Sequence, residues 1–123
     1  MKVILAIGSG SFIGGVSRYL LSQFIQTRST TAFPFGTLGV NLIGCLLIGI
    51  VFGISDKSNM GHEWKMFLAT GLLGGFTTFS AFSNETISML RDGQLLNAGY
   101  YISASVVLGL AATFLGFMIV RFF

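Results

Sequence analysis

Hydrophobic residues fall into four long stretches separated by short polar segments. The stretches cover about residues 3–24, 36–54, 65–90 and 97–120. Each is close to or above the roughly 20 apolar residues that an α-helix needs to cross the hydrocarbon core of a bilayer. The pattern therefore predicts an all-α membrane protein with four transmembrane helices, arranged as a single domain over residues 1–123.

The third stretch is interrupted near its middle by Gly74, Gly75, Thr77 and Thr78. Adjacent glycines loosen a helix, and β-branched threonines do little to restore it. Within hydrocarbon, a break leaves amides and carbonyls unpaired, which is tolerated only where protein, water or an ion satisfies them. We therefore expect the third helix to be broken mid-span, from Gly74 to Thr78, beside a polar path or site.

Aromatic and hydroxyl side chains align on one face after this break. In a helix, Phe79, Phe82, Ser83 and Thr86 share a face, with Glu85 on its flank. Two phenyl rings and a ladder of hydroxyls indicate the wall of a path. The alternative is that the rings are packing residues and the hydroxyls bond back to their own helix.

The other spans carry few polar residues. Asn41, in the second span, could join two helices by hydrogen bonds or present its NH₂ group to a passing ion. Arg18, late in the first span, is expected to snorkel to the interface. Tyr101, Ser105 and Thr113 form a polar stripe on the fourth span, and such a stripe faces protein or water rather than lipid.

Glycines in the first two spans are spaced for close approach between helices. Gly10 and Gly14 form a small-x-x-x-small pattern in the first span, and Gly49 and Gly53 form one in the second. Without large side chains at these positions, a neighbouring backbone can come into contact. We therefore expect both helices to pack closely on others.

Composition excludes several classes of protein. Of the 123 residues, 53% are hydrophobic and 9% are charged, whereas a soluble domain carries roughly 25% charged residues. The single Cys45 can form no intramolecular disulfide, and the net charge of +3 is spread over several loops rather than gathered for nucleic acid. With no set of nucleophile, base and orienting group, and no cluster of metal ligands, an enzyme is not expected.

Positive charges are nearly balanced across the membrane. With four spans, the side that holds both termini carries Lys2, Lys57, Lys65 and Arg121, and the other side carries Arg28 and Arg91, with Arg18 close to it. Because positive charge in short loops sets orientation, the chain is predicted to insert either way round. Two oppositely inserted copies could pair about an axis at the midplane, where carbonyls of the two broken helices would form a cage for a small cation.

Two segments of the chain resemble a known family. These are Gly74-Gly-Phe-Thr-Thr-Phe-Ser-Ala-Phe-Ser-Asn-Glu85 and, upstream, Gly36-Thr-Leu-Gly-Val-Asn-Leu-Ile-Gly44. They resemble the Fluc fluoride channels, also called the CrcB family, and the likeness extends to the length, the four spans and Arg18 in the first. The resemblance implies an antiparallel, dual-topology homodimer in the inner (plasma) membrane that exports fluoride passively through two pores and gives fluoride resistance.

The resemblance also implies roles for single residues. Asn41 would lie in the pore near the vestibule, and Phe79 and Phe82 of both subunits would line each pore. The backbone carbonyls of Gly74 and Thr77 would bind a structural Na⁺ on the two-fold axis, which is not transported.

A polar track along the fourth span is implied as well. Tyr101, Ser105 and Thr113 would continue the fluoride path, with Ser83 and Thr86 on the third span beside it. Gly109 departs from the pattern, because some relatives carry a hydroxyl residue there. Amide and hydroxyl donors and the positive rims of phenyl rings suit a strongly hydrated anion, but fluoride selectivity itself rests on the resemblance.

Two other functions fit part of the sequence. The first is a small dual-topology, proton-coupled multidrug exporter, for which Glu85 is the only candidate membrane carboxylate; it leaves the break unexplained. The second is a structural subunit or assembly factor of a larger membrane complex, in which the glycines serve as packing surfaces.

Overall fold

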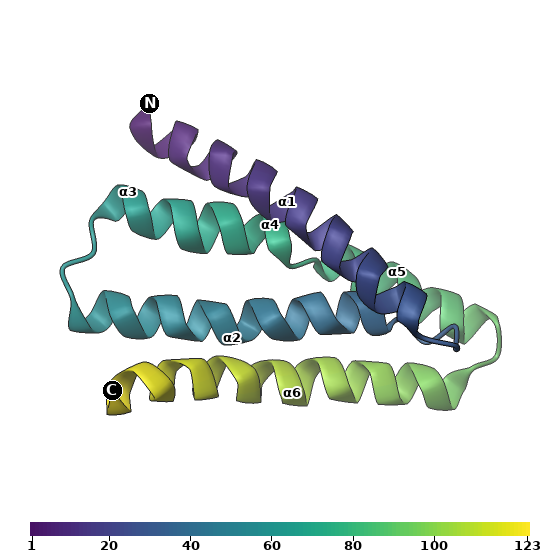
Figure 1. The fold of residues 1–123 in the computed structure, drawn as a ribbon. Helices are drawn as coiled ribbons and strands as arrows, with labels where there is room; N and C mark the ends of the chain where they lie inside the picture. The colour runs from purple at the N-terminus through teal and green to yellow at the C-terminus, as the bar shows by residue number, and fades with distance from the viewer.

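A computed structural model describes all of residues 1–123, and the chain is helical apart from short connections (Figure 1). The elements are α1 (Lys2–Arg28), α2 (Phe35–Lys57), α3 (His62–Lys65), η1 (Met66–Leu73), α4 (Gly74–Phe76), α5 (Phe79–Arg91) and α6 (Leu95–Phe122). The elements from α3 to α5 form one bent third helix, His62–Arg91. Four helices are thus long and apolar enough to cross a membrane, which confirms the predicted spans in number and order.

The helices form two closely packed pairs. Figure 1 shows α2 and α6 side by side along most of their length, while α1 crosses the third helix obliquely near α4. Both termini lie at the end of the molecule where α3 begins, as an even number of crossings requires.

Glycines make the contact between α1 and the third helix possible. A Cβ atom added to Gly10 would lie 2.6 Å from Phe67 O, and one added to Gly14 would overlap Leu72 O. Side chains at these positions would push the two helices apart, so the expectation of close packing from their spacing is confirmed.

The pair α2 and α6 uses the same device from both sides. A Cβ atom on Gly49 would overlap Thr113 O of α6, and one on Gly116 would overlap Leu46 O of α2. Backbone therefore packs on backbone at two points of this pair, which fixes the groups that α2 and α6 present to the break.

The third helix is broken within the predicted segment, but at the two threonines and not at the two glycines. Gly74 and Gly75 remain helical in α4, and extended backbone occurs at Thr77 (φ −97°, ψ 156°) and Thr78 (φ −147°, ψ 116°). β-branched threonines suit extended backbone. Gly75 instead permits close approach of α1, because a Cβ atom there would lie 2.6 Å from Ser11 O.

A π-helical segment, η1, directly precedes α4, and the sequence did not predict it. A π-helix pairs residues five apart, is rare, and is frequently found at functional sites. The apolar run Met66–Leu73 indicates a helix, but hydrophobicity does not distinguish a π-helix from an α-helix. The third helix is therefore irregular over its whole middle, from η1 to Thr78.

Candidate ion path at the helix break

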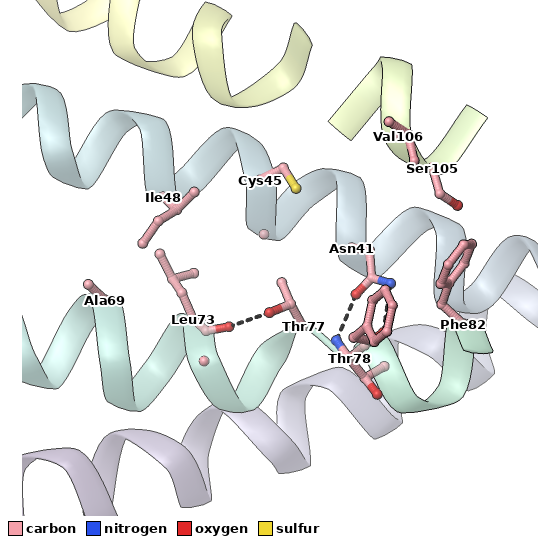
Figure 2. A pocket seen from close by; sticks show the side chains of 13 residues that line it. Asn41, Cys45, Ile48, Ala69, Leu73, Thr77, Thr78, Phe82, Ser105 and Val106 are labelled. Atoms are coloured by element: carbon pink, nitrogen blue, oxygen red, sulfur yellow. Dashed lines mark hydrogen bonds between the residues drawn. The ribbon is translucent and has the colours of Figure 1, made fainter. Parts of the chain in front are cut away.

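A groove with a volume of about 430 Å³ lies along the break (Figure 2). It is lined by Asn41, Gly44, Cys45, Ile48, Ala69, Leu73, Gly74, Thr77, Thr78, Phe79, Phe82, Ser105 and Val106. The lining is mostly apolar, carries no charged side chain, and offers amide and hydroxyl groups at a few points. α2, α6 and the broken helix thus meet at one mostly apolar surface that carries a few polar groups.

The groove brings together part of the predicted site. The residues that line it are Asn41, Gly74, Thr77, Phe79, Phe82 and Ser105. The predicted residues that lie outside it are Ser83, Thr86, Tyr101 and Thr113.

The residues outside the groove have other environments. Thr86 is buried and its hydroxyl donates to Phe82 O at 2.7 Å, which is the back-bonding alternative considered for this face. The backbone carbonyl of Thr113 lies against Gly49, in the close contact between α6 and α2. Ser83 is exposed on α5, and Tyr101 is fully buried.

Aromatic rings form a row that ends in the groove. The ring centroids of Tyr101 and Phe82 are 5.1 Å apart, and those of Phe82 and Phe79 are 5.5 Å apart. Phe79 is 78% exposed, although it is a large apolar side chain. The row therefore runs from a buried anchor to a ring that this chain alone does not cover.

Asn41 holds the break to α2. Its Nδ2 donates to Thr78 O at 3.0 Å, and Thr78 N donates to its Oδ1 at 2.8 Å. Figure 2 shows the Asn41 side chain pointing toward Thr78. One side-chain amide thus pairs with the backbone on both sides of Thr78. Because an Asn amide has two N–H donors, one remains beyond this pairing.

The break releases two backbone carbonyls in particular. In a continuous α-helix, Thr78 N would donate to Gly74 O and Ala81 N would donate to Thr77 O. Here Thr78 N donates to Asn41 Oδ1, and Ala81 N donates to Thr78 Oγ1 at 3.2 Å. The donors that would satisfy Gly74 O and Thr77 O are therefore diverted to side chains.

The carbonyl of Gly75 has a different partner. Arg18 Nε donates to Gly75 O at 3.1 Å, from α1 to the break. The sequence predicted a side chain that snorkels to the interface, and the structure adds a hydrogen bond from its Nε to the third helix. The close approach of α1 at Gly14 and Gly75 brings a carbonyl within reach, and a charged side chain in a membrane takes the nearest acceptor.

The sequence did not predict the hydrogen bonds that surround the Glu85 carboxylate, next to the row of rings. Glu85 of α5 accepts from Thr37 Oγ1 at 2.7 Å and from Tyr101 OH at 2.6 Å, one bond to each oxygen. It therefore links α2, α5 and α6. Thr37 lies one turn before Asn41 on α2, so the shared face of these two residues was the available signal.

Comparison with known proteins decides the family. A family model described as "CrcB-like protein, Camphor Resistance (CrcB)" matches residues 5–117. The chain belongs to the CrcB family. The likeness that the segments around Asn41 and Gly74 predicted is thus confirmed, and with four long apolar helices the chain is a multi-pass membrane protein.

Relatives within this family cover nearly the whole chain. A protein of Flavobacterium psychrophilum is 49% identical over 122 residues, 98% of each chain. One of Rhizobium etli is 45% identical over 118 residues, 95% of this chain and 94% of the relative. One of Phocaeicola vulgatus is 43% identical over 116 residues, 94% of this chain and 96% of the relative. Each is named "Fluoride-specific ion channel FluC".

Proposed function

We propose that this protein is a fluoride-selective channel that lets fluoride leave the cell passively and so gives fluoride resistance. The groove at the helix break carries the proposal, in a chain whose full-length relatives are named fluoride-specific ion channels. Asn41 and Ser105 offer hydrogen-bond donors, and Phe79 and Phe82 offer ring edges with positive partial charge. Without a fixed positive charge, these groups are weak, repeated sites of the kind that conduction needs.

We infer that a second copy, inserted the opposite way round, supplies the other wall of the path. The exposed ring of Phe79 and the nearly balanced loop charges support an antiparallel homodimer. Such a pair would have two pores related by symmetry, each containing Phe79 and Phe82 from both subunits. The structural-subunit alternative does not require such self-pairing.

We propose that a structural Na⁺ is bound at the break by the carbonyl oxygens of Gly74 and Thr77 from both subunits. The diversion of their helical donors to Asn41 and Thr78 supports this, since carbonyls without donors in a membrane need another partner. Bound Na⁺ would offset the carbonyl dipoles and hold the two subunits together. It would not be transported.

We retain the remaining predicted residues as secondary positions of the path. Ser83 and Thr113 offer hydroxyls outside the groove. The hydroxyl protons of Thr86 and Tyr101 are already donated to Phe82 O and Glu85. Their contribution to fluoride passage would therefore require these bonds to exchange.

Ion release from liposomes tests the proposal. Liposomes that contain only this protein and potassium fluoride should release fluoride when valinomycin is added, whereas chloride-loaded liposomes should release almost none. Protein-free liposomes are the control. Equal release of the two anions would contradict selectivity, and proton-driven uptake of a cationic drug without fluoride release would favour the exporter. Bacteria without a fluoride defence should also regain growth in fluoride when they make the protein.

A further inference from the structure

We propose that Arg18 is a positioning residue that shapes the cation site through one hydrogen bond, from its Nε to Gly75 O. The inference rests on the proposed Na⁺ site, because it concerns which carbonyls of the break are left to bind the ion. Arg18 itself does not contact the ion in this proposal.

The backbone carbonyls at the break differ in whether they keep a hydrogen-bond donor. Gly74 O and Thr77 O lose their helical donors to side chains, as described above. Gly75 O lies between them in sequence, and Arg18 Nε satisfies it at 3.1 Å. This bond removes a competing ligand and fixes the peptide plane between Gly75 and Phe76. The two carbonyls on either side are then held in one arrangement.

The packing of α1 brings the Arg18 side chain to the break. Ser11, Gly14 and Arg18 lie on one face of α1 at helical spacing. A Cβ atom on Gly75 would lie 2.6 Å from Ser11 O, and one on Gly14 would overlap Leu72 O, so this face lies directly against the break. Arg18 continues the same face by one turn, and its aliphatic stem therefore spans only a short gap.

The contact atom makes the hydrogen bond separable from the charge. Gln carries its Nε2 the same number of bonds from Cα as Arg carries Nε, so Arg18→Gln keeps a donor in place and removes the charge. Arg18→Met has a methyl group there, and so removes both. Arg18→Lys keeps the charge but has a methylene group at that position. A positioning bond and a general electrostatic role therefore predict opposite rankings.

The experiment measures the fraction of dimer in detergent as Na⁺ replaces an organic cation. In detergent the subunits can pair in either orientation, so an effect of the Arg18 charge on membrane insertion cannot change the result. With Arg18→Gln, the Na⁺ concentration at half-maximal dimer should stay within about threefold of the unmodified chain. With Arg18→Met it should rise about tenfold, the factor expected for one lost hydrogen bond to a buried group, and Arg18→Lys should resemble Met.

Arg28→Gln is the matched control. Arg28 is on the same helix, but its guanidinium lies over the Phe24 ring at 4.4 Å, so its loss should not change the Na⁺ midpoint. If Arg18→Met fails to fold, the comparison of Arg18→Gln with Arg18→Lys still decides. A role through the hydrogen bond predicts the lower Na⁺ concentration at half-maximal dimer for Arg18→Gln, and a role through charge predicts the lower one for Arg18→Lys. Equal loss with Gln and Met, or no loss in any variant, overturns the proposal.

The unmodified chain separates this proposal from the one on which it rests. If the dimer fraction of the unmodified chain does not change with Na⁺ concentration, the cation site and the role of Arg18 are both overturned. Na⁺-dependent dimer with the wrong ranking of Arg18 variants would overturn only the role of Arg18.

Discussion

Asn41 has one role in the fold and a second, proposed role in the path. Its amide pairs with the backbone on both sides of Thr78, and this pairing diverts the Thr78 N–H from Gly74 O. The same amide lines the groove. The two roles assigned to Asn41 from the sequence, a link between helices and a pore donor, are therefore compatible, and the structure contains the first of them.

Asn41→Asp tests this dual role. The carboxylate can still accept from Thr78 N, but it loses the donor to Thr78 O and repels an anion. We expect fluoride efflux to fall at least about tenfold and the free energy of unfolding to fall by roughly 1–3 kcal/mol. Efflux from liposomes and thermal unfolding in detergent check this. Asn59→Asp, in the exposed loop after α2, is the control; equal efflux in both variants would contradict the role of Asn41.

The two phenylalanines of the groove should respond differently in stability and alike in flux. Phe79→Ile and Phe82→Ile keep apolar bulk but remove the ring edge, so both should reduce fluoride efflux sharply. Phe79 is exposed, so its replacement should leave subunit stability almost unchanged, whereas Phe82 packs on Tyr101 and its replacement should cost about 1 kcal/mol. Phe122→Ile, near the end of α6, is the control. Unchanged efflux with both groove variants would show that the rings only pack.

Tyr101 anchors the carboxylate of Glu85, and a neighbouring tyrosine provides a control. Tyr101→Phe removes the donor to Glu85 Oε2 and leaves one oxygen of a half-buried carboxylate without that bond. The free energy of unfolding should fall by about 1–3 kcal/mol, as measured by thermal unfolding in detergent. Tyr100→Phe should have no comparable effect, since Tyr100 is 59% exposed. Similar losses in both variants would show that the hydrogen bond to Glu85 does not stabilise the fold.

At the scale of elements, the position of α1 depends on Gly14, which faces the third helix, and not on its neighbour Gly15, which faces open space. A Cβ atom on Gly14 would overlap Leu72 O, while one on Gly15 would meet nothing within 4 Å. Gly14→Ala should therefore destabilise the protein by roughly 1–3 kcal/mol through overpacking. Gly15→Ala should be neutral or stabilise it by up to about 1 kcal/mol, because Ala favours a helix more than Gly does. Thermal unfolding of the two variants checks this, and equal effects would refute the packing of α1.

The sequence predicted the elements better than their irregularities. Four apolar runs determine four spanning helices, because the bilayer sets their length. The glycine and threonine cluster located the break, but Thr77 and Thr78 leave the helix while Gly75 packs on α1. The π-helix escaped prediction because its pattern of apolar residues is that of any helix.

The candidate site was also predicted only in part. Asn41 was found because it is a polar residue in an apolar span, and Phe79 and Phe82 were found because their spacing places them on one face of a helix. The partners of Glu85 and Arg18 were not found, since each lies on another helix and depends on how closely those helices approach. Long-range contacts of this kind follow from packing, which a single sequence does not display.

At the scale of the whole molecule, one face of the chain carries an open groove. Its groove exposes Phe79 and two carbonyls whose helical donors are diverted. The positive charges of its loops are nearly balanced between the two ends of the helices. The inverted second copy that we propose would account for both features, because symmetry about a mid-membrane axis would bring the two broken helices together. We therefore propose that the fluoride path forms only between oppositely oriented copies.

Forced orientation tests that claim most directly. A short run of lysines after Arg121 should hold that end in the cytoplasm, and a matching run beside Arg91 should insert the chain the other way round. Fluoride efflux is then measured from cells that make either variant alone or both together. The account predicts almost no efflux from each variant alone and near-normal efflux from the two together. Full efflux from a single, uniformly oriented variant would contradict it.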